Sequence, residues 1–303
     1  MNAREWLATD AEVPQLALLG APISKASITP VESWTTPPAF REALRRFPTW
    51  DAKRYVDIAD LAVRDLGDVQ GDREEADARV AHARIEVAAE AAARLAENVV
   101  VIGGDNSLTR PAMRGLMQAL PGPWGLLTLD AHHDCRPATE GSRNGTPVRE
   151  LIEAGLPGDR VAQIGIHPLG NAREHADWAR AQGIHIVPLH TVERDGMDSV
   201  IASALSQLVS HGAERIYVDF DIDVVDRAFA PACPASLPGG MEPDELLRAA
   251  HLLGADPHVV AADLCEVDAN ADVNSMTVRL MAATFLYFCS GLAVRARVIH
   301  VNE

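Results

Sequence analysis

Short apolar runs rich in β-branched residues alternate with longer amphipathic stretches along most of this chain. Runs of about four to eight apolar residues are typical of buried strands, and the amphipathic stretches have the spacing of helices. We expect strands at residues 15–20, 55–59, 98–102, 124–129, 161–166, 184–189, 215–221 and 258–264. We expect helices at about residues 37–46, 72–97, 107–118, 146–153, 172–182, 199–211, 242–253 and 273–293. This alternation predicts an α/β fold in which helices cover both faces of a parallel sheet.

The composition fits one globular domain and disfavours several classes of partner. Of the 303 residues, 48% are hydrophobic, and no linker, repeat or low-complexity tract divides the chain, so we expect a single domain over residues 1–303. The net charge of −16 disfavours nucleic acid and anionic membranes as partners. No signal peptide is visible and no apolar run approaches membrane-spanning length, so we expect a cytoplasmic protein. Among the four cysteines, Cys265 and Cys289 lie in apolar runs and are expected to be buried thiols.

Two of the expected strands end in clusters of metal-binding side chains. Asp130, His132 and Asp134 directly follow the run at 124–129, and residues two apart in an extended segment point to the same side. The run at 215–221 leads into four aspartates within eight residues, at positions 219, 221, 223 and 226. Carboxylates at this density repel one another unless a cation lies between them, and mixed oxygen and nitrogen donors suit Mn, Zn, Fe or Ni. The alternative is a solvated acidic loop, which the apolar flanking residues disfavour.

The long loops that follow strands one, four and seven are expected to wall one site. They span residues 21–37, 134–146 and 223–242 and are rich in Pro, Gly, Ser and Thr. Loops at the carboxyl ends of strands are where α/β proteins place their binding residues.

Four segments in order carry a resemblance to a known family. They are Gly103-Gly-Asp-Asn-Ser107, Asp130-Ala-His-His-Asp134, Asp219-Phe-Asp-Ile-Asp-Val-Val-Asp226 and Glu266. Together they resemble the ordered motifs of the ureohydrolase (arginase/agmatinase) superfamily, over about residues 15–295. The resemblance implies a three-layer α/β/α sandwich with an eight-stranded parallel sheet. It also implies two bound Mn²⁺ ions, with Ni²⁺ or Zn²⁺ as alternatives, and a homo-oligomer.

The resemblance also assigns the metal ligands. Asp130 and Asp221 would bridge the two ions together with a hydroxide, and His132 and Asp223 would complete the ligands of one ion. Asp134 would bind the other ion and hydrogen-bond the hydroxide. The sixth position holds Asn106 where the family has histidine, and an amide oxygen is a weaker ligand than imidazole. We therefore expect weaker occupancy of that ion, or a site that holds only one.

Further family positions assign the substrate contacts. Glu266 would pair with the amidine of the substrate, because two carboxylate oxygens can accept parallel N–H donors. Asn144 replaces the histidine of the H-G-x-P segment and cannot transfer a proton near neutral pH, although its amide can donate to a substrate group. Proton delivery would then fall to Asp134, to water or to His133, although His133 is expected to point away from the ligands.

Basic residues next to the metal motif favour a substrate that carries a carboxylate. Arg136 follows the motif directly, and Arg143 and Arg149 lie close by; the alternative for Arg136 is a solvated loop cation. The whole pattern resembles a branch associated with formimidoylglutamase activity, which would hydrolyse N-formimino-L-glutamate to L-glutamate and formamide in histidine catabolism. Three alternatives stay open. The chain could be an agmatinase, arginase or guanidino-acid hydrolase that releases urea, a hydrolase of another C–N bond, or a catalytically weak binding protein.

Overall fold

A parallel eight-stranded sheet forms the centre of the computed structural model, which describes residues 1–302 and their side chains as far as residue 297. The order across the sheet is β4-β1-β5-β10-β9-β6-β7-β8. The strands are β1 (Leu16–Ala21), β4 (Val63–Asp68), β5 (Asn98–Gly103), β6 (Trp124–Leu129), β7 (Val161–Ile166), β8 (His185–Pro188), β9 (Arg215–Asp221) and β10 (Val259–Cys265). A separate antiparallel pair joins β2 (Trp50–Asp51) and β3 (Val56–Asp57).

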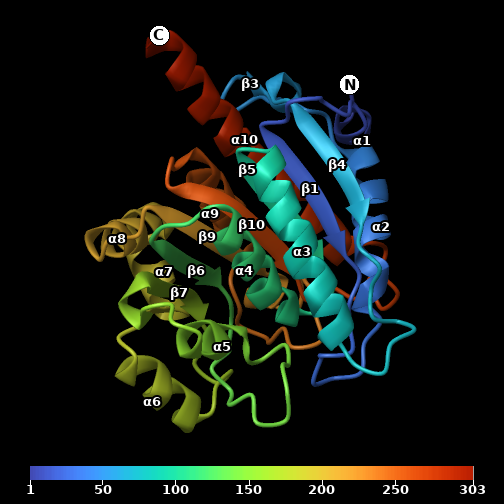
Figure 1. The fold of residues 1–303 in the computed structure, drawn as a ribbon. Helices are drawn as coiled ribbons and strands as arrows, with labels where there is room; N and C mark the ends of the chain where they lie inside the picture. Colours follow the sequence, from blue (N-terminus) through green and yellow to red (C-terminus); the bar gives the residue numbers. More distant parts are fainter. Residues whose placement is uncertain (303) are drawn as a thin grey trace.

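Helices cover both faces of this sheet (Figure 1). One face packs against α3 (Arg79–Leu95), α4 (Thr109–Ala119), α5 (Pro147–Glu153) and α6 (Arg173–Ala181). The other packs against α1 (Ala3–Leu7), α2 (Thr36–Ala43), α7 (Leu189–Asp195), α8 (Met197–Ser210), α9 (Pro243–Ala255) and α10 (Met276–Asn302). Each layer has its own apolar core, with Ile85 and Met113 fully buried in the first and Phe40 and Phe285 in the second. The predicted three-layer α/β/α sandwich is confirmed.

One of the eight expected strands was wrong. Residues 55–59 do not join the sheet, because the Asp57 side chain accepts a hydrogen bond from the Ala59 N–H and starts a short 3₁₀ turn there. The missing strand is β4 at the sheet edge, where charged residues interrupt the apolar pattern. Its Asp65 pairs with Arg41 of α2 at 2.7 Å, so this edge is stabilised by an ion pair that local periodicity does not reveal.

Two expectations about helices also need correction. The helix expected at residues 72–97 begins only at Arg79, and the short helices α1 and α7 were not expected. An apolar stretch long enough to cross a membrane does occur in α10, at residues 276–297. However, 72% of it is buried inside the protein, where α10 lies beside α9, so α10 is a core helix of this fold.

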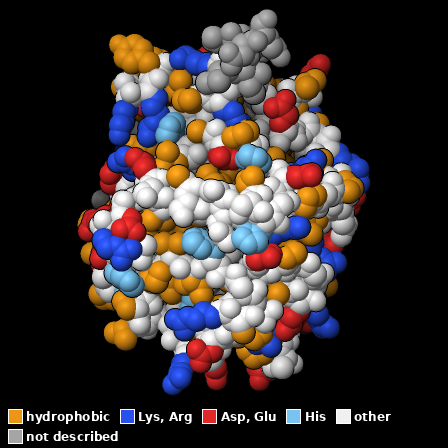
Figure 2. Space-filling view, turned by 90° about the vertical axis from the view of Figure 1, so that its left-hand side faces the viewer, with side chains coloured by type: hydrophobic (Ala, Val, Ile, Leu, Met, Phe, Trp, Pro, Cys, Tyr) orange, Lys and Arg blue, Asp and Glu red, His pale blue; other side chains and the backbone are white. Residues whose placement is uncertain are grey.

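Many of the acidic side chains are inside the protein. Asp130, Asp221, Asp223 and Glu266 are at most 3% exposed, and all four cysteines are buried free thiols, as expected for Cys265 and Cys289. On the face seen in Figure 2, acidic and basic side chains are interspersed with apolar ones. The net negative charge therefore arises in part from carboxylates held in the interior.

Candidate metal centre

The predicted metal ligands converge at the carboxyl ends of four adjacent strands. Strands β5, β10, β9 and β6 are neighbours in the middle of the sheet. Asn106, Glu266, Asp223 and Asp134 lie just beyond the ends of these strands, in that order. One cavity at this edge is lined by His132, Asp134, Asp221, Asp223 and Glu266, among others. Asn106 and Asp130 are buried behind this wall.

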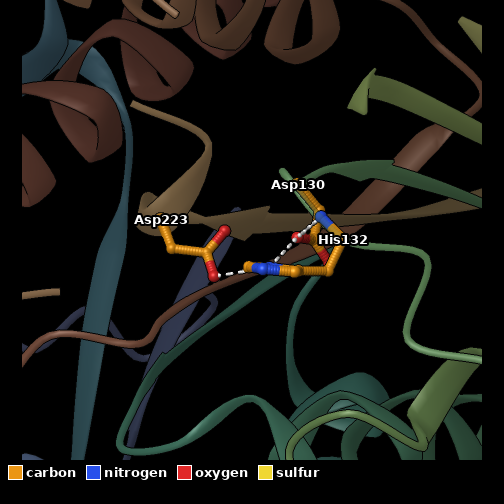
Figure 3. Close-up of side chains that lie close together, drawn as sticks. All are labelled: Asp130, His132 and Asp223. Atoms are coloured by element: carbon orange, nitrogen blue, oxygen red, sulfur yellow. Dashed lines mark hydrogen bonds and ion pairs between the residues drawn. The ribbon is translucent and has the colours of Figure 1, made fainter. Parts of the chain in front are cut away.

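Three of these side chains form a compact cluster (Figure 3). His132 Nδ1 lies 2.9 Å from Asp223 Oδ2 and 3.4 Å from Asp130 Oδ1. One donor atom from each of the three residues falls within 4.8 Å of the others. Asp130 Oδ2 is buried and has no hydrogen-bond partner among the described residues. Since a buried carboxylate oxygen is almost always paired, the unpartnered oxygen and the donor set fit a bound cation.

The charges of the cluster favour such a cation. Burial, with the charge of Asp223, raises the pKa of Asp130 to about 7. Burial also holds the pKa values of Asp134 and Asp221 well above their usual range. The Asp223 charge raises the pKa of His132 to about 12, and this ion pair keeps the pKa of Asp223 below its usual value although burial alone would raise it. Without a metal, protons relieve the repulsion between these carboxylates, and a divalent cation can take their place.

Asn106 is held as a hydrogen-bond donor toward the site. Its Nδ2 donates to Asp134 Oδ2 at 2.6 Å, while its Oδ1 accepts from the Thr109 hydroxyl at 2.7 Å. The amide oxygen, which is the atom that could bind a metal, is therefore occupied on the side facing Thr109. Coordination by Asn106 would require rotation of the amide, which would end the hydrogen bond that Oδ1 accepts from Thr109.

Asn144 fastens Glu266 to the loop that follows β1. Glu266 Oε1 accepts from the Asn106 backbone N–H at 2.7 Å and from Asn144 Nδ2 at 3.1 Å. Asn144 Oδ1 in turn accepts from the Ile28 backbone N–H at 3.0 Å. Asn144 thus orients the carboxylate of Glu266 and connects two walls of the cavity.

Two of the site residues have strained backbones. Asp134 and Glu266 have φ angles of 51° and 61°, in the left-handed region that non-glycine residues rarely adopt. Each such residue costs on the order of 1–3 kcal/mol, and such strain tends to collect at functional sites. The strain is held by backbone hydrogen bonds, from Glu266 N–H to the Gly104 carbonyl at 2.9 Å and from Arg149 N–H to the Asp134 carbonyl at 3.3 Å.

One histidine and two aspartates near the predicted ligands contact the surrounding protein and do not face the cluster. His133 Nδ1 lies 2.7 Å from Gln163 Oε1, so His133 points away from the ligands as expected. Asp226 accepts from the Ala228 and Gly239 backbone N–H groups and fixes its loop. Asp219 is fully buried beside Asp263 on the neighbouring strand.

The walls of the cavity come from the three predicted loops and from a fourth segment that we did not predict. Ile28, Arg136, Asn144 and Ala235 represent the predicted loops. The fourth segment follows β7 and contributes Gly170, Asn171 and His175. Its position after the carboxyl end of an expected strand could have indicated this segment. However, it is shorter than the three predicted loops.

Comparisons with known proteins agree with this geometry. The model of the arginase family matches residues 14–290. A formimidoylglutamase of Halalkalibacterium halodurans is 35% identical over 286 residues, which cover 92% of this chain and 88% of that protein. The crystal structure of formimidoylglutamase from Bacillus subtilis superposes with a TM-score of 0.88 at 28% identity, covering 95% of this chain and 89% of the other. Trypanosoma cruzi formiminoglutamase, solved with Mn²⁺, has the same fold with a TM-score of 0.88 at 23% identity, covering 97% and 99% of the two chains.

Proposed function

The chain belongs to the arginase family, and from this premise we propose that it is a metal-dependent hydrolase of N-formimino-L-glutamate. Hydrolysis of the C–N bond would add water to the formimino carbon and give L-glutamate and formamide. The observation that carries the proposal is that one cavity is lined both by His132 and Asp223, which cluster with the buried Asp130, and by the carboxylate of Glu266. The formimidoylglutamases similar to this chain over more than nine-tenths of its length support the choice of substrate.

We propose that the resident metal is Mn²⁺, in two ions. Asp130, His132, Asp134, Asp221 and Asp223 would hold them, and the buried, unpartnered oxygen of Asp130 supports this assignment. When bound, the ions would lower the pKa of a water molecule so that it can attack the amidine carbon at neutral pH. The mixed carboxylate and imidazole donors also suit Ni²⁺ or Zn²⁺. Because Asn106 faces Asp134 with its nitrogen, we propose that the ion next to Asp134 is the more weakly bound one.

Glu266 would hold the amidine end of the substrate. Its Oε1 already accepts two hydrogen bonds within the protein, which leaves Oε2 for the N–H groups of the substrate. The carboxylate is 3% exposed and burial raises its pKa to about 8, so a cationic amidine would favour its charged form. Asn144 keeps this carboxylate in position and would act on the substrate mainly through it.

Arg136 would hold a carboxylate at the other end. Its side chain lies over Gly145, where an added Cβ would come within 2.8 Å of the Arg136 Cδ. The guanidinium pairs with no carboxylate among the described residues, although it lines the cavity. Agmatine has no carboxylate and would leave this cation unpaired, which is why we favour an amino-acid substrate.

Asp134 is the residue best placed to move the proton. It lines the cavity, and burial holds its pKa well above the usual value, which favours its protonated form. Its Oδ2 is occupied by Asn106, which leaves Oδ1 for the reaction. We propose that Asp134 Oδ1 delivers the proton to the departing amine of glutamate, because His133 faces Gln163 and Asn144 cannot titrate.

The cellular setting completes the proposal. We propose a cytoplasmic homo-oligomer that acts in histidine catabolism on a small amidine, with neither nucleic acid nor a membrane as partner. Four buried free thiols fit a reducing compartment.

A product screen tests the function. The purified protein, supplied with Mn²⁺, is incubated with formiminoglutamate, arginine, agmatine and guanidino acids, and formamide, ammonia and urea are measured. Formamide from formiminoglutamate, with little urea from the other compounds, is the expected result. Urea release from arginine or agmatine as the main activity would refute this substrate while leaving the family assignment intact.

A further inference from the structure

Two cavities meet at the outer end of the proposed site. The inner one contains the metal-binding cluster and Glu266, and the outer one contains Arg143 and Glu174. Arg136 and His175 line both cavities, so they stand where the two join. A ligand that reaches from Glu266 into the outer cavity would therefore pass close to both side chains.

His175 is a buried base with a poor partner. It lies in the first turn of α6 and is 8% exposed. The carboxylate next to it is Glu174 at 3.5 Å, but the Glu174 side chain is 81% exposed, so water screens that ion pair. Burial lowers the pKa of His175, and the charges of Arg136 and Arg149 lower it further. The charge of Glu174 acts in the opposite direction.

Arg136 and His175 differ from the other basic group nearby in having no close, well-shielded counter-ion. Arg149 pairs with Glu153 at 2.7 Å and stacks over the ring of Trp178 at 4.8 Å. Within the described residues no buried carboxylate pairs with Arg136 or His175. A buried histidine beside an arginine, with only an exposed carboxylate near it, is an arrangement that a bound anion would stabilise.

The start of α6 adds to this preference for an anion. The residue before the helix is Ala172, and no side chain caps the N–H groups of the first turn. Gly170 and Asn171, which lead into the helix, line the inner cavity. An uncapped helix N-terminus carries partial positive charge and attracts carboxylates, so it acts in the same direction as His175 and Arg136.

We propose that Arg136 and His175 form a carboxylate subsite where the two cavities join, and that His175 selects substrates whose far end is anionic. This inference rests on the proposed function, because it places the carboxylate remote from the formimino group in the subsite while Glu266 holds the formimino group. A substrate that ends in a neutral or cationic group would leave both basic residues unpaired. His175 therefore determines specificity without touching the reacting carbon.

Direct binding of a carboxylate probe tests the subsite without turnover. Glutarate binding to the Mn²⁺-loaded protein is measured by calorimetry at pH 6 and pH 8.5, for the wild type, His175→Gln and Arg136→Gln. His190→Gln is the matched control, because His190 is exposed on α7 and lines neither cavity. Formamidinium, which carries only the amidine head, serves as the second probe.

We expect wild-type affinity for glutarate to fall as the pH rises, because the protonated imidazole binds the anion. His175→Gln should weaken glutarate binding about tenfold at pH 6 and remove most of the pH dependence. Arg136→Gln should weaken glutarate binding at both pH values but keep its pH dependence. His190→Gln should change neither the affinity for glutarate nor its pH dependence. Formamidinium binding should stay unchanged in His175→Gln, which shows that the variant is folded.

Two outcomes overturn the subsite. One is unchanged glutarate affinity in His175→Gln at pH 6, and the other is an equal loss for glutarate and formamidinium. The proposed function fails separately: His175-dependent glutarate binding without formamide release would keep the subsite and reject the substrate. Formamide release, together with glutarate binding that does not depend on His175, would support the substrate and reject the subsite.

Discussion

Replacing Asn106 by histidine should strengthen metal binding and weaken the metal-free protein. Asn106 is 1% exposed, and its amide gives its nitrogen to Asp134 and its oxygen to Thr109. An imidazole would offer the ion next to Asp134 a nitrogen lone pair, which binds Mn²⁺ or Zn²⁺ more strongly than an amide. It would also lose the Thr109 hydrogen bond, worth about 1 kcal/mol net, and would overfill a buried site at a cost of about 1–3 kcal/mol.

The two effects can be measured separately. We expect the free energy of unfolding of the metal-free Asn106→His protein, measured by chemical denaturation, to be about 2–4 kcal/mol lower than that of the wild type. Calorimetric titration with Mn²⁺ should show that the more weakly bound ion gains affinity by about tenfold or more. Substitutions of residues that support metal ligands change metal affinity by a similar factor.

Asn106→Leu is the matched control, since leucine has a similar volume to histidine and so fills the buried site to the same extent, but offers no atom that could bind a metal. It should not tighten metal binding. The reasoning is refuted if Asn106→His binds Mn²⁺ no better than the wild type, or if Asn106→Leu gains as much affinity as Asn106→His. Either result would mean that residue 106 does not reach the ion.

Three further predictions concern the ligands, the substrate and pH. Asp221→Ala should lose bound metal and activity together, and full metal content in that variant, by elemental analysis, would show that Asp221 is not a ligand. Arg136→Ala should raise KM for formiminoglutamate about tenfold, or about 1.4 kcal/mol, with little change for formamidine, and an equal loss in kcat/KM for both would contradict a role in carboxylate binding. Apparent Mn²⁺ affinity should fall as the pH drops through about 7, because the metal-free Asp130 has its pKa raised to about 7 and is then protonated. A flat calorimetric profile from pH 8.5 to 6 would argue against this.

The sequence was informative about the strand ends because local chemistry determines them. Buried strands are short apolar runs, and an acid such as Asp130 or Asp221 directly after one must lie at the carboxyl edge of a parallel sheet. The number of strands was right, although one was misplaced. The edge strand β4 contains Asp65 and Asp68, which are tolerated because Arg41 of α2 pairs with both of them. Pairing between segments far apart in the chain is invisible to a local pattern.

The details of the site depend on contacts that periodicity does not encode. Asn106 could be identified as a departure from the family motif, but its orientation follows from the Thr109 hydroxyl on the next helix. Asn144 is expected to contact substrate, and the sequence did not indicate that its amide also bridges Glu266 and Ile28. His175 was missed altogether, because only the packing of α6 beside the inner cavity brings it to the site.

Metal-dependent release of formamide from formiminoglutamate is the activity that we propose for this chain. Metal-stripped protein is titrated with Mn²⁺, and the rate of formamide release is followed at a fixed concentration of formiminoglutamate. We expect no activity without metal and a rate that rises and saturates as two ions bind per chain. Formamide release that is independent of added metal, or saturated Mn²⁺ binding without any formamide, would contradict it.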